Sequence, residues 1–178
     1  AMGDTGVVIY SNSVFGARTN YEGGPSALAA ALTGRTPRYG FHLDDMRRGS
    51  RLFRVDHQPS DWSEWGALGG FIGREMGSYY EVPVLDGITS PPSSDDLKHF
   101  GAAMASFGST ALFHMVGVTP EAPELSSVFD GKTPEAQAIG KTDIDDFFAA
   151  YATDDDTLDV VVFAAPQLSL FELERLAR

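Results

Sequence analysis

A polar stretch near the start of the 178-residue sequence carries the side chains best suited to hold a small anion. Arg18 is the principal one, because its planar guanidinium can donate two parallel hydrogen bonds to a carboxylate or phosphate. Further donors lie close to it in the sequence: Asn12, Ser13, Thr19 and Asn20. We therefore predict that these five residues bind an anionic ligand.

The polar stretch is expected to connect a strand to a helix. An apolar run at residues 7–10 indicates a buried strand. Pro25 is tolerated at the first turn of a helix, because the amide hydrogen that it lacks would have been unpaired anyway. The alanine-rich residues 26–32 predict the helix itself, and Gly34 would end it. This arrangement would present free backbone N–H groups to an anion.

Two later segments hold further candidate residues, because ligands in open α/β sheets collect at the carboxyl ends of strands. His114 lies inside the apolar run 110–116 and is followed by Thr119 and Glu121. It is either a buried histidine satisfied by a backbone carbonyl or a site histidine that binds substrate or orients a carboxylate. The other segment is Ala-Ala-Pro-Gln at residues 164–167.

Apolar runs alternate with helical patterns along the chain, which predicts an α/β fold, a layered sheet with flanking helices. Further strands are expected at residues 51–56, 82–85, 110–116 and 158–164. Further helices are expected at 62–76, 95–107, 143–151 and from 168 onward, with Thr142 capping the third. Residues 1–178 would form a single domain, with two lobes divided near the Ser- and Pro-rich stretch 89–94 as an alternative.

The net charge of −12 is unevenly distributed. The first 74 residues carry +1, with several arginines between residues 35 and 54, and the rest carry −13. The arginines form either a solvated basic loop or a local field that attracts a small anion. A strongly acidic chain would repel nucleic acid. No apolar run is long enough to span a membrane, and the expected location is cytoplasmic.

The sequence contains no cysteine, which excludes disulfides and any metal site held by thiolates of this chain. Its histidines, His42, His57, His99 and His114, show no paired spacing of metal ligands, and His99 is expected to face solvent. We therefore predict no metal or cofactor within this chain. Purified alone, it should be colourless and free of iron.

Several motifs together point to one family. They are Asn-Ser at 12–13, Gly-Ala-Arg-Thr at 16–19 and Gly-Gly-Pro-Ser-Ala-Leu-Ala-Ala at 23–30. Similar motifs continue through residues 32–44, 66–69, 96–98, 111–122 and, more weakly, 165–172. This sequence resembles the aconitase X family of hydro-lyases over nearly its whole length. The resemblance implies an aconitase-like catalytic-domain fragment.

The resemblance also implies an activity, namely elimination of water from a small anionic hydroxy acid such as a hydroxyproline or phosphorylated mevalonate. That reaction needs a base at a carbon-bound proton, an acid at the leaving hydroxyl and anchors for the carboxylate. The implied partner is a swivelling domain or small subunit of the same enzyme. The resemblance favours His114 as a site residue. Glu22 and Glu121 are the carboxylates within the motifs, and each is either a structural loop residue or the base.

One loop departs from the family. Relatives carry Cys or Asn before Pro-His, and some use the Cys for an iron–sulfur cluster or iron, whereas this chain has Ala165 and Gln167. Alanine cannot bind a metal, and glutamine cannot replace a titrating imidazole. Either metal ligands come from elsewhere in the complete enzyme, or the subtype is metal-free, or catalysis is lost.

Three interpretations of the function remain open from sequence. The leading one is a fragment of a dehydratase that contributes substrate-anchoring loops. The second is a non-catalytic relative that binds a small acid or a partner protein without turnover, and the third is a scaffold. We expect an excised piece of a longer protein, because residues 1–3 have the look of a tag remnant and the helix opened by residues 169–172 has no stop signal. The isolated chain is therefore predicted to be inactive.

Overall fold

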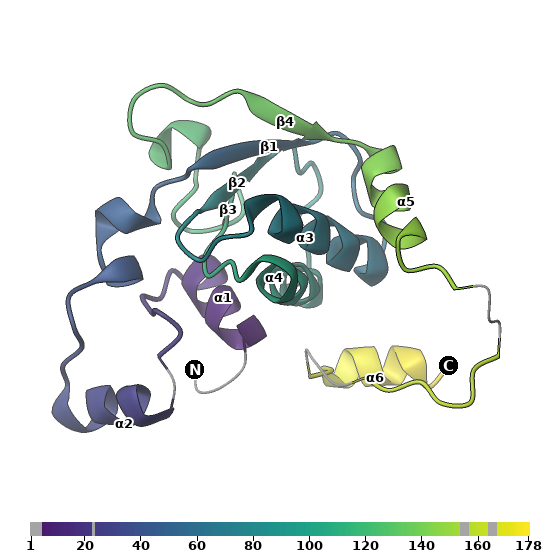
Figure 1. Cartoon of the computed structure of the whole chain (residues 1–178), viewed down its shortest axis with the longest axis horizontal. Coiled ribbons are helices and arrows are strands. Elements are labelled where there is room, and N and C mark those ends of the chain that lie inside the picture. The colour runs from purple at the N-terminus through teal and green to yellow at the C-terminus, as the bar shows by residue number, and fades with distance from the viewer. Residues whose placement is uncertain (1–4, 23, 154–156, 164–166) are drawn as a thin grey trace.

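The computed structural model describes residues 5–22, 24–153, 157–163 and 167–178 (Figure 1). Its longer helices are α1 (Thr5–Val14), α2 (Gly24–Thr33), α3 (Trp62–Met76), α4 (Ser94–Gly108), α5 (Lys141–Ala149) and α6 (Leu170–Leu176). Its strands are β1 (Arg51–Val55), β2 (Pro83–Asp86), β3 (His114–Met115) and β4 (Ala136–Ile139). Short 3-10 helices occur at Gly40–His42 (η1), Asp44–Arg47 (η2) and Leu125–Ser127 (η3). The expected α/β class is confirmed.

The four strands form one parallel sheet in the order β3-β2-β1-β4. Leu52 of β1 pairs with Val84 of β2 on one side and with Ala136 of β4 on the other. Because successive side chains of a strand point to opposite faces, the two faces of the sheet build separate cores. Phe53 and Leu85 belong to the larger core on the helix face, while Leu52 and Val84 pack with residues of the loop that follows β3.

Helices α3 and α4 lie together against one face of the sheet (Figure 1). Both begin at side-chain caps, since Asp61 accepts a hydrogen bond from Glu64 N and Ser93 forms a capping box with Asp96. The glycines of residues 62–76 allow the close approach that the sequence predicts. A Cβ at Gly73 would stand 2.6 Å from the carbonyl oxygen of Met104, so only glycine fits there.

The strand predicted at residues 7–10 is wrong, because these residues lie inside helix α1. Val8 and Ile9 are buried as predicted, but Ile9 packs against α4 near Gly101. A short apolar run does not distinguish a buried strand from a buried helix. The consequence is that Asn12 and Ser13 are held on the last turn of a helix instead of in a loop after a strand.

Two other predicted strands differ from the structure. The run 110–116 contains only the two-residue β3, because side chains of helix α1 bind the backbone groups that a longer strand would use. Asn12 donates to Ala111 O, and Ser13 accepts from Phe113 N. The run 158–164 forms no strand in its described residues, which are exposed, and residue 164 lies outside the described residues. Strand β4 was not predicted.

The remaining elements follow the sequence closely. β1, β2, α3, α4 and α6 appear within two residues of their expected bounds. Helix α5 starts earlier than expected, with Gly140 at its N-cap in place of Thr142. A division into lobes near 89–94 stays a prediction, and residues 1–3, interpreted as a tag remnant, lie outside the described residues. None of the helices in the described parts of the chain is long and apolar enough to cross a membrane.

Candidate anion-binding site

A pocket of about 260 Å³ lies between the α1–α2 connection, helix α2 and the segment that leads into η1. We call it the Arg18 pocket. Its lining residues are Arg18, Thr19, Glu22, Ala27, Ala30, Thr36 and His42. The segments that support it precede strands along the chain: residues 39–44 come before η2 and β1, and residues 110–111 come shortly before β3. The pocket therefore adjoins the amino ends of these strands, whereas the candidate ligand residues were expected at the carboxyl ends of strands.

Arg18 reaches over the pocket from the α1–α2 connection. Its Nη1 donates to the carbonyl oxygen of His42 at 3.0 Å, and its Nη2 pairs with the carboxylate of Asp44. The side chains of Arg18 and Asp44 are 41% and 77% exposed, so solvent screens this ion pair. A ligand carboxylate or phosphate can replace Asp44 on the guanidinium without any buried group being uncovered.

Glu22 and His42 form a hydrogen-bonded pair in the wall of the same pocket. His42 Nε2 lies 2.5 Å from Glu22 Oε1, and the other carboxylate oxygen accepts from Asn20 N at 2.7 Å. Burial raises the pKa of the Glu22 carboxyl, but the hydrogen bonds from Asn20 N–H and His42 outweigh it and hold the pKa below its ordinary value. Glu22 is thus a carboxylate at neutral pH, and it orients the imidazole.

Asn12 lies in the protein interior next to the pocket, where it supports the loop of Thr19 without lining the pocket itself. It is fully buried, donates to Thr19 O and Ala111 O, and accepts from both the amide and the hydroxyl of Thr19. Asn20 also works through the backbone, since it donates to Tyr39 O and accepts from Phe41 N. Of the five residues predicted to bind an anion, the structure places Arg18 and Thr19 at the pocket and Asn12 and Asn20 in support of it. Ser13 lies apart from it and accepts from Phe113 N.

His114 lies apart from the Arg18 pocket. It is buried, and its Nε2–H donates to the carbonyl oxygen of Arg47 at 2.7 Å, as the backbone-carbonyl alternative anticipates. Burial lowers the pKa of His114, which keeps the ring neutral. Its Nδ1 has no partner among the described protein groups, and the ring borders a small hollow of about 40 Å³ beside Asp44 and Glu121.

Arg47 and His42 are functional-site residues that the sequence alone did not predict. The Arg47 side chain is 2% exposed and donates to the carbonyl oxygens of Phe41 and Asn12 and to the Glu121 carboxylate. It thereby ties α1, η1 and the loop after β3 into one unit behind the site. In the sequence it was one arginine within a basic cluster, and no local signal distinguishes it from its exposed neighbours. Glu121 is held by Arg47, as a structural loop residue would be, and its alternative role as the base stays a prediction.

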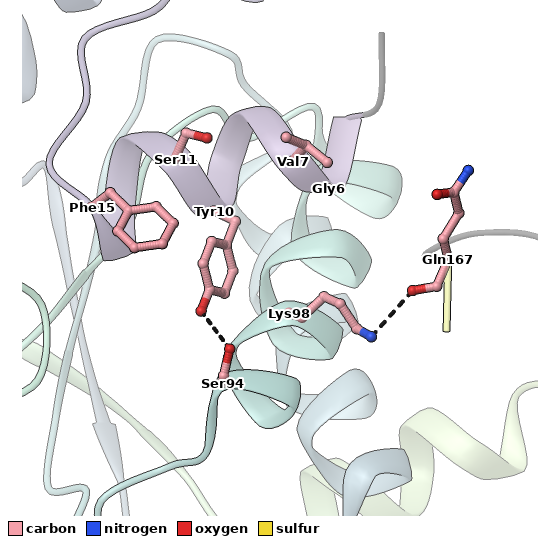
Figure 2. A pocket seen from close by; sticks show the side chains of 8 residues that line it. All are labelled: Gly6, Val7, Tyr10, Ser11, Phe15, Ser94, Lys98 and Gln167. Carbon is pink, nitrogen blue, oxygen red and sulfur yellow. Dashed lines mark hydrogen bonds between the residues drawn. The ribbon is translucent and has the colours of Figure 1, made fainter. Parts of the chain in front are cut away.

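A second and larger pocket, of about 380 Å³, lies between α1, the start of α4 and Gln167. Figure 2 shows its lining, where the Tyr10 hydroxyl meets Ser94 Oγ at 2.9 Å and Lys98 Nζ donates to Gln167 O at 3.2 Å. Ser11, which directly precedes the predicted Asn12, and Gln167 of the predicted segment 164–167 both line it. Residues 164–166 lie outside the described residues. Lys98 is already neutralised by Asp95 and Glu172, so this pocket is less suited to an anion.

The described residues do not fit a metal centre. They contain no group of three His, Cys, Asp or Glu side chains arranged to hold an ion. The sequence also has no cysteine to supply a thiolate. Iron or a cluster in a complete enzyme would need further ligands from outside the described residues, and no chemical step of this site is assigned to it.

Comparison with known proteins defines the class. Residues 1–45 match the aconitase X first domain and residues 49–149 match the aconitase X second domain. The chain belongs to the aconitase X family. It also superposes on the crystal structure of Thermococcus kodakaraensis aconitase X (holo-form) with a TM-score of 0.84 and 34% identity, over 98% of this chain and 43% of that one.

Curated relatives are dehydratases. The chain is 44% identical over 177 residues to the phosphomevalonate dehydratase large subunit of Methanothermobacter thermautotrophicus, covering 99% of this chain and 43% of the relative. It is 35% identical over 178 residues to the cis-3-hydroxy-L-proline dehydratase of Pseudomonas aeruginosa, covering 98% of this chain and 30% of the relative. This chain therefore spans less than half the length of these proteins.

Proposed function

We propose that this chain is the substrate-anchoring part of a hydro-lyase that removes water from a small anionic hydroxy acid. The observation that carries the proposal is the Arg18 pocket, in which an exposed guanidinium, a hydroxyl and a carboxylate–histidine pair face one space. The relatives named as dehydratases of phosphomevalonate and cis-3-hydroxy-L-proline support an anionic hydroxy acid as the ligand.

Each side chain of the pocket has a part in the proposal. Arg18 exchanges Asp44 for the carboxylate or phosphate of the substrate and holds it with two parallel hydrogen bonds. Thr19, whose amide and hydroxyl both donate to Asn12, holds the loop that carries Arg18 in place. His42, oriented by the Glu22 carboxylate, is the group able to hold or release a proton near the substrate.

The complete enzyme is part of the proposal. A swivelling domain or small subunit would close the pocket, and any iron or iron–sulfur cluster would take at least part of its ligands from outside the described residues of this chain. The isolated chain should bind the acid but not dehydrate it. Turnover of 5-phosphomevalonate or cis-3-hydroxy-L-proline by the isolated chain would contradict this assignment.

The test is the substitution Arg18→Lys, with Arg54→Lys as the matched control because Arg54 also forms an exposed ion pair, with Asp56, outside the pocket. Lysine keeps the charge but cannot bind bidentately. We expect 5-phosphomevalonate, titrated calorimetrically, to bind more weakly by about 1.5–3 kcal/mol in Arg18→Lys and unchanged in the control. Lower stability with unchanged affinity would make Arg18 structural.

A second candidate function is binding of a small acid without turnover. The sequence favours it at one place, where Ala165 and Gln167 stand instead of the Cys or Asn and the His that the family resemblance implies for this loop. The two functions separate in the full-length protein. A dehydratase converts the bound acid, whereas a binding protein retains the Arg18-dependent affinity and releases the acid unchanged.

A further inference from the structure

Glu22 and His42 are brought together without any helix or strand that contains both. Glu22 belongs to the connection between α1 and α2, whereas His42 is the last residue of η1. The chain between them runs through helix α2, which stands away from the sheet (Figure 1) and has no buried residue. Closing such a loop costs conformational entropy, so the pair needs contacts that fix its two segments directly against each other.

Asn20 makes those contacts. Its backbone N–H donates to Glu22 Oε2 at 2.7 Å. Its side-chain amide binds the other segment, because Nδ2 donates to Tyr39 O at 3.1 Å and Oδ1 accepts from Phe41 N at 2.6 Å. One residue therefore holds the carboxylate directly and holds the imidazole through the backbone of η1.

The backbone has unusual conformations on both sides of this contact. Tyr21, which lies between Asn20 and Glu22, has a φ of +54°, a conformation that is uncommon and costly for a residue with a side chain. Gly40 has a φ of +52°, and a Cβ at this position would collide with Asn20 Oδ1. The η1 segment admits the amide of Asn20 only because residue 40 is a glycine.

The two segments are also anchored in one small core. The Tyr21 hydroxyl donates to Thr110 O at 2.9 Å. The ring of Tyr79 lies 5.6 Å from that of Tyr21 and 5.3 Å from that of Phe41, centroid to centroid. Phe41 is fully buried. These contacts hold the strained turn in place, so the position of Asn20 is fixed before any ligand binds.

We propose that Asn20 is the positioning residue of the Glu22–His42 pair, and through the pair of the group that holds or releases a proton near the substrate. Asn20 does not line the Arg18 pocket, and both of its amide atoms are bound to backbone groups, so it acts through other residues. The use of the pair in catalysis rests on the proposed function. Its alignment by Asn20 does not.

The test follows the imidazole Nε2–H proton of His42 by NMR. A carboxylate partner shifts this resonance downfield and slows its exchange with water, and His42→Gln identifies it. Two further histidine–carboxylate pairs serve as internal references, His57 with Glu64 and His99 with Glu172. The second of these pairs corrects the expectation that His99 faces solvent, because Glu172 is fully buried against it.

Two substitutions disturb the contact in different ways. Asn20→Ala removes the amide, whereas Gly40→Ala displaces it and leaves Asn20 in the chain. The matched control is Gly34→Ala, because Gly34 has a similar φ of +65° but no atom within 4 Å of an added Cβ. We expect the His42 proton to exchange about tenfold faster in both variants and at an unchanged rate in the control, as for the loss of one hydrogen bond. The two reference pairs should be unaffected throughout.

An unchanged His42 resonance in Asn20→Ala or in Gly40→Ala would overturn the proposal. So would the loss of all three histidine resonances in Gly40→Ala, since Asn20 would then serve the fold as a whole. If Asn20→Ala does not fold, Gly40→Ala and its control decide the matter. Calorimetric titration with 5-phosphomevalonate separates this result from the proposed function. Absence of binding would remove that function alone, and binding with an unaffected His42 resonance would remove the positioning role alone.

Discussion

Two arginines of this molecule donate to backbone carbonyls of neighbouring residues, His42 and Phe41, and have opposite environments. Arg47 is buried, and its guanidinium donates to two backbone carbonyl oxygens and to the Glu121 carboxylate. Arg18 is half exposed, with one backbone carbonyl and the solvated carboxylate of Asp44. Both are arginine–carboxylate pairs, yet one is a fixed part of the structure and the other can exchange its partner.

The difference shows what makes an arginine available to a ligand. A guanidinium whose partners are buried cannot leave them without uncovering a charge, which costs several kcal/mol. A pair at the surface is worth about 0–1 kcal/mol, so an incoming anion competes with it easily. The buried arginine holds the segments that position the exposed one, because Arg47 binds the carbonyl oxygens of Asn12 and Phe41.

The largest effect is expected from Arg47→Met, which keeps an unbranched apolar side chain and removes the guanidinium with its charge. It leaves Glu121 and two carbonyl oxygens without their partner, so the free energy of unfolding should fall by about 3–5 kcal/mol. Urea denaturation measures this. In the double variant Arg47→Met with Glu121→Gln, part of the loss should be recovered. A loss below about 1 kcal/mol would show that Arg47 is no more structural than a surface pair.

The interface between α3 and α4 provides a steric comparison for the loss of stability expected from Arg47→Met. Gly73→Ala places a methyl group 2.6 Å from Met104 O, and we expect it to cost about 1–3 kcal/mol through overpacking. Gly66→Ala in the same helix meets no atom within 4 Å and should stabilise α3 by about 0.5–1 kcal/mol. The same urea experiment compares them. Equal effects would mean that α3 and α4 are not in close contact in solution.

The scaffold could be predicted from the sequence where the pattern is long and its ends are marked. Helices α3 and α4 have helical periodicity over fifteen residues each and capping side chains at Asp61 and Ser93. Strand β4 could not, because only Ile139 of its four residues is buried and no apolar alternation marks it. Helix α1 was mistaken for a strand because four apolar residues fit either period.

The candidate site could be predicted only for residues that are close in the sequence. Arg18 and Thr19 stand out by donor type within one loop. The pair of Glu22 and His42 joins residues twenty positions apart, and only the folded η1 segment brings them together. The strand expected at 158–163 has strand composition, but a strand needs a partner to pair with, and composition alone does not supply one.

The free energy of unfolding is expected to depend on pH because His114 is buried. Burial lowers the pKa of His114, whereas in the unfolded chain it has its ordinary value of about 6.5. Between these values the unfolded state binds more protons, so the free energy of unfolding should fall as the pH is lowered below about 6.5, by up to about 1.4 kcal/mol per unit. His114→Gln should flatten this slope between pH 7 and 5. An unchanged slope would assign it to other groups.

The smallest expected effect on stability belongs to the exposed pair, and it separates the two arginines most directly. Asp44→Asn removes the carboxylate that occupies the Arg18 guanidinium, and because the pair is solvated the free energy of unfolding should change by less than about 1 kcal/mol. Since Asp44 then no longer competes, 5-phosphomevalonate should bind more tightly by up to about 1 kcal/mol, roughly fivefold. Calorimetric titration and urea denaturation on the same sample measure both. Weaker binding after Asp44→Asn would mean that Asp44 holds Arg18 in place for the ligand, and the contrast between an exchangeable and a fixed arginine would then fail.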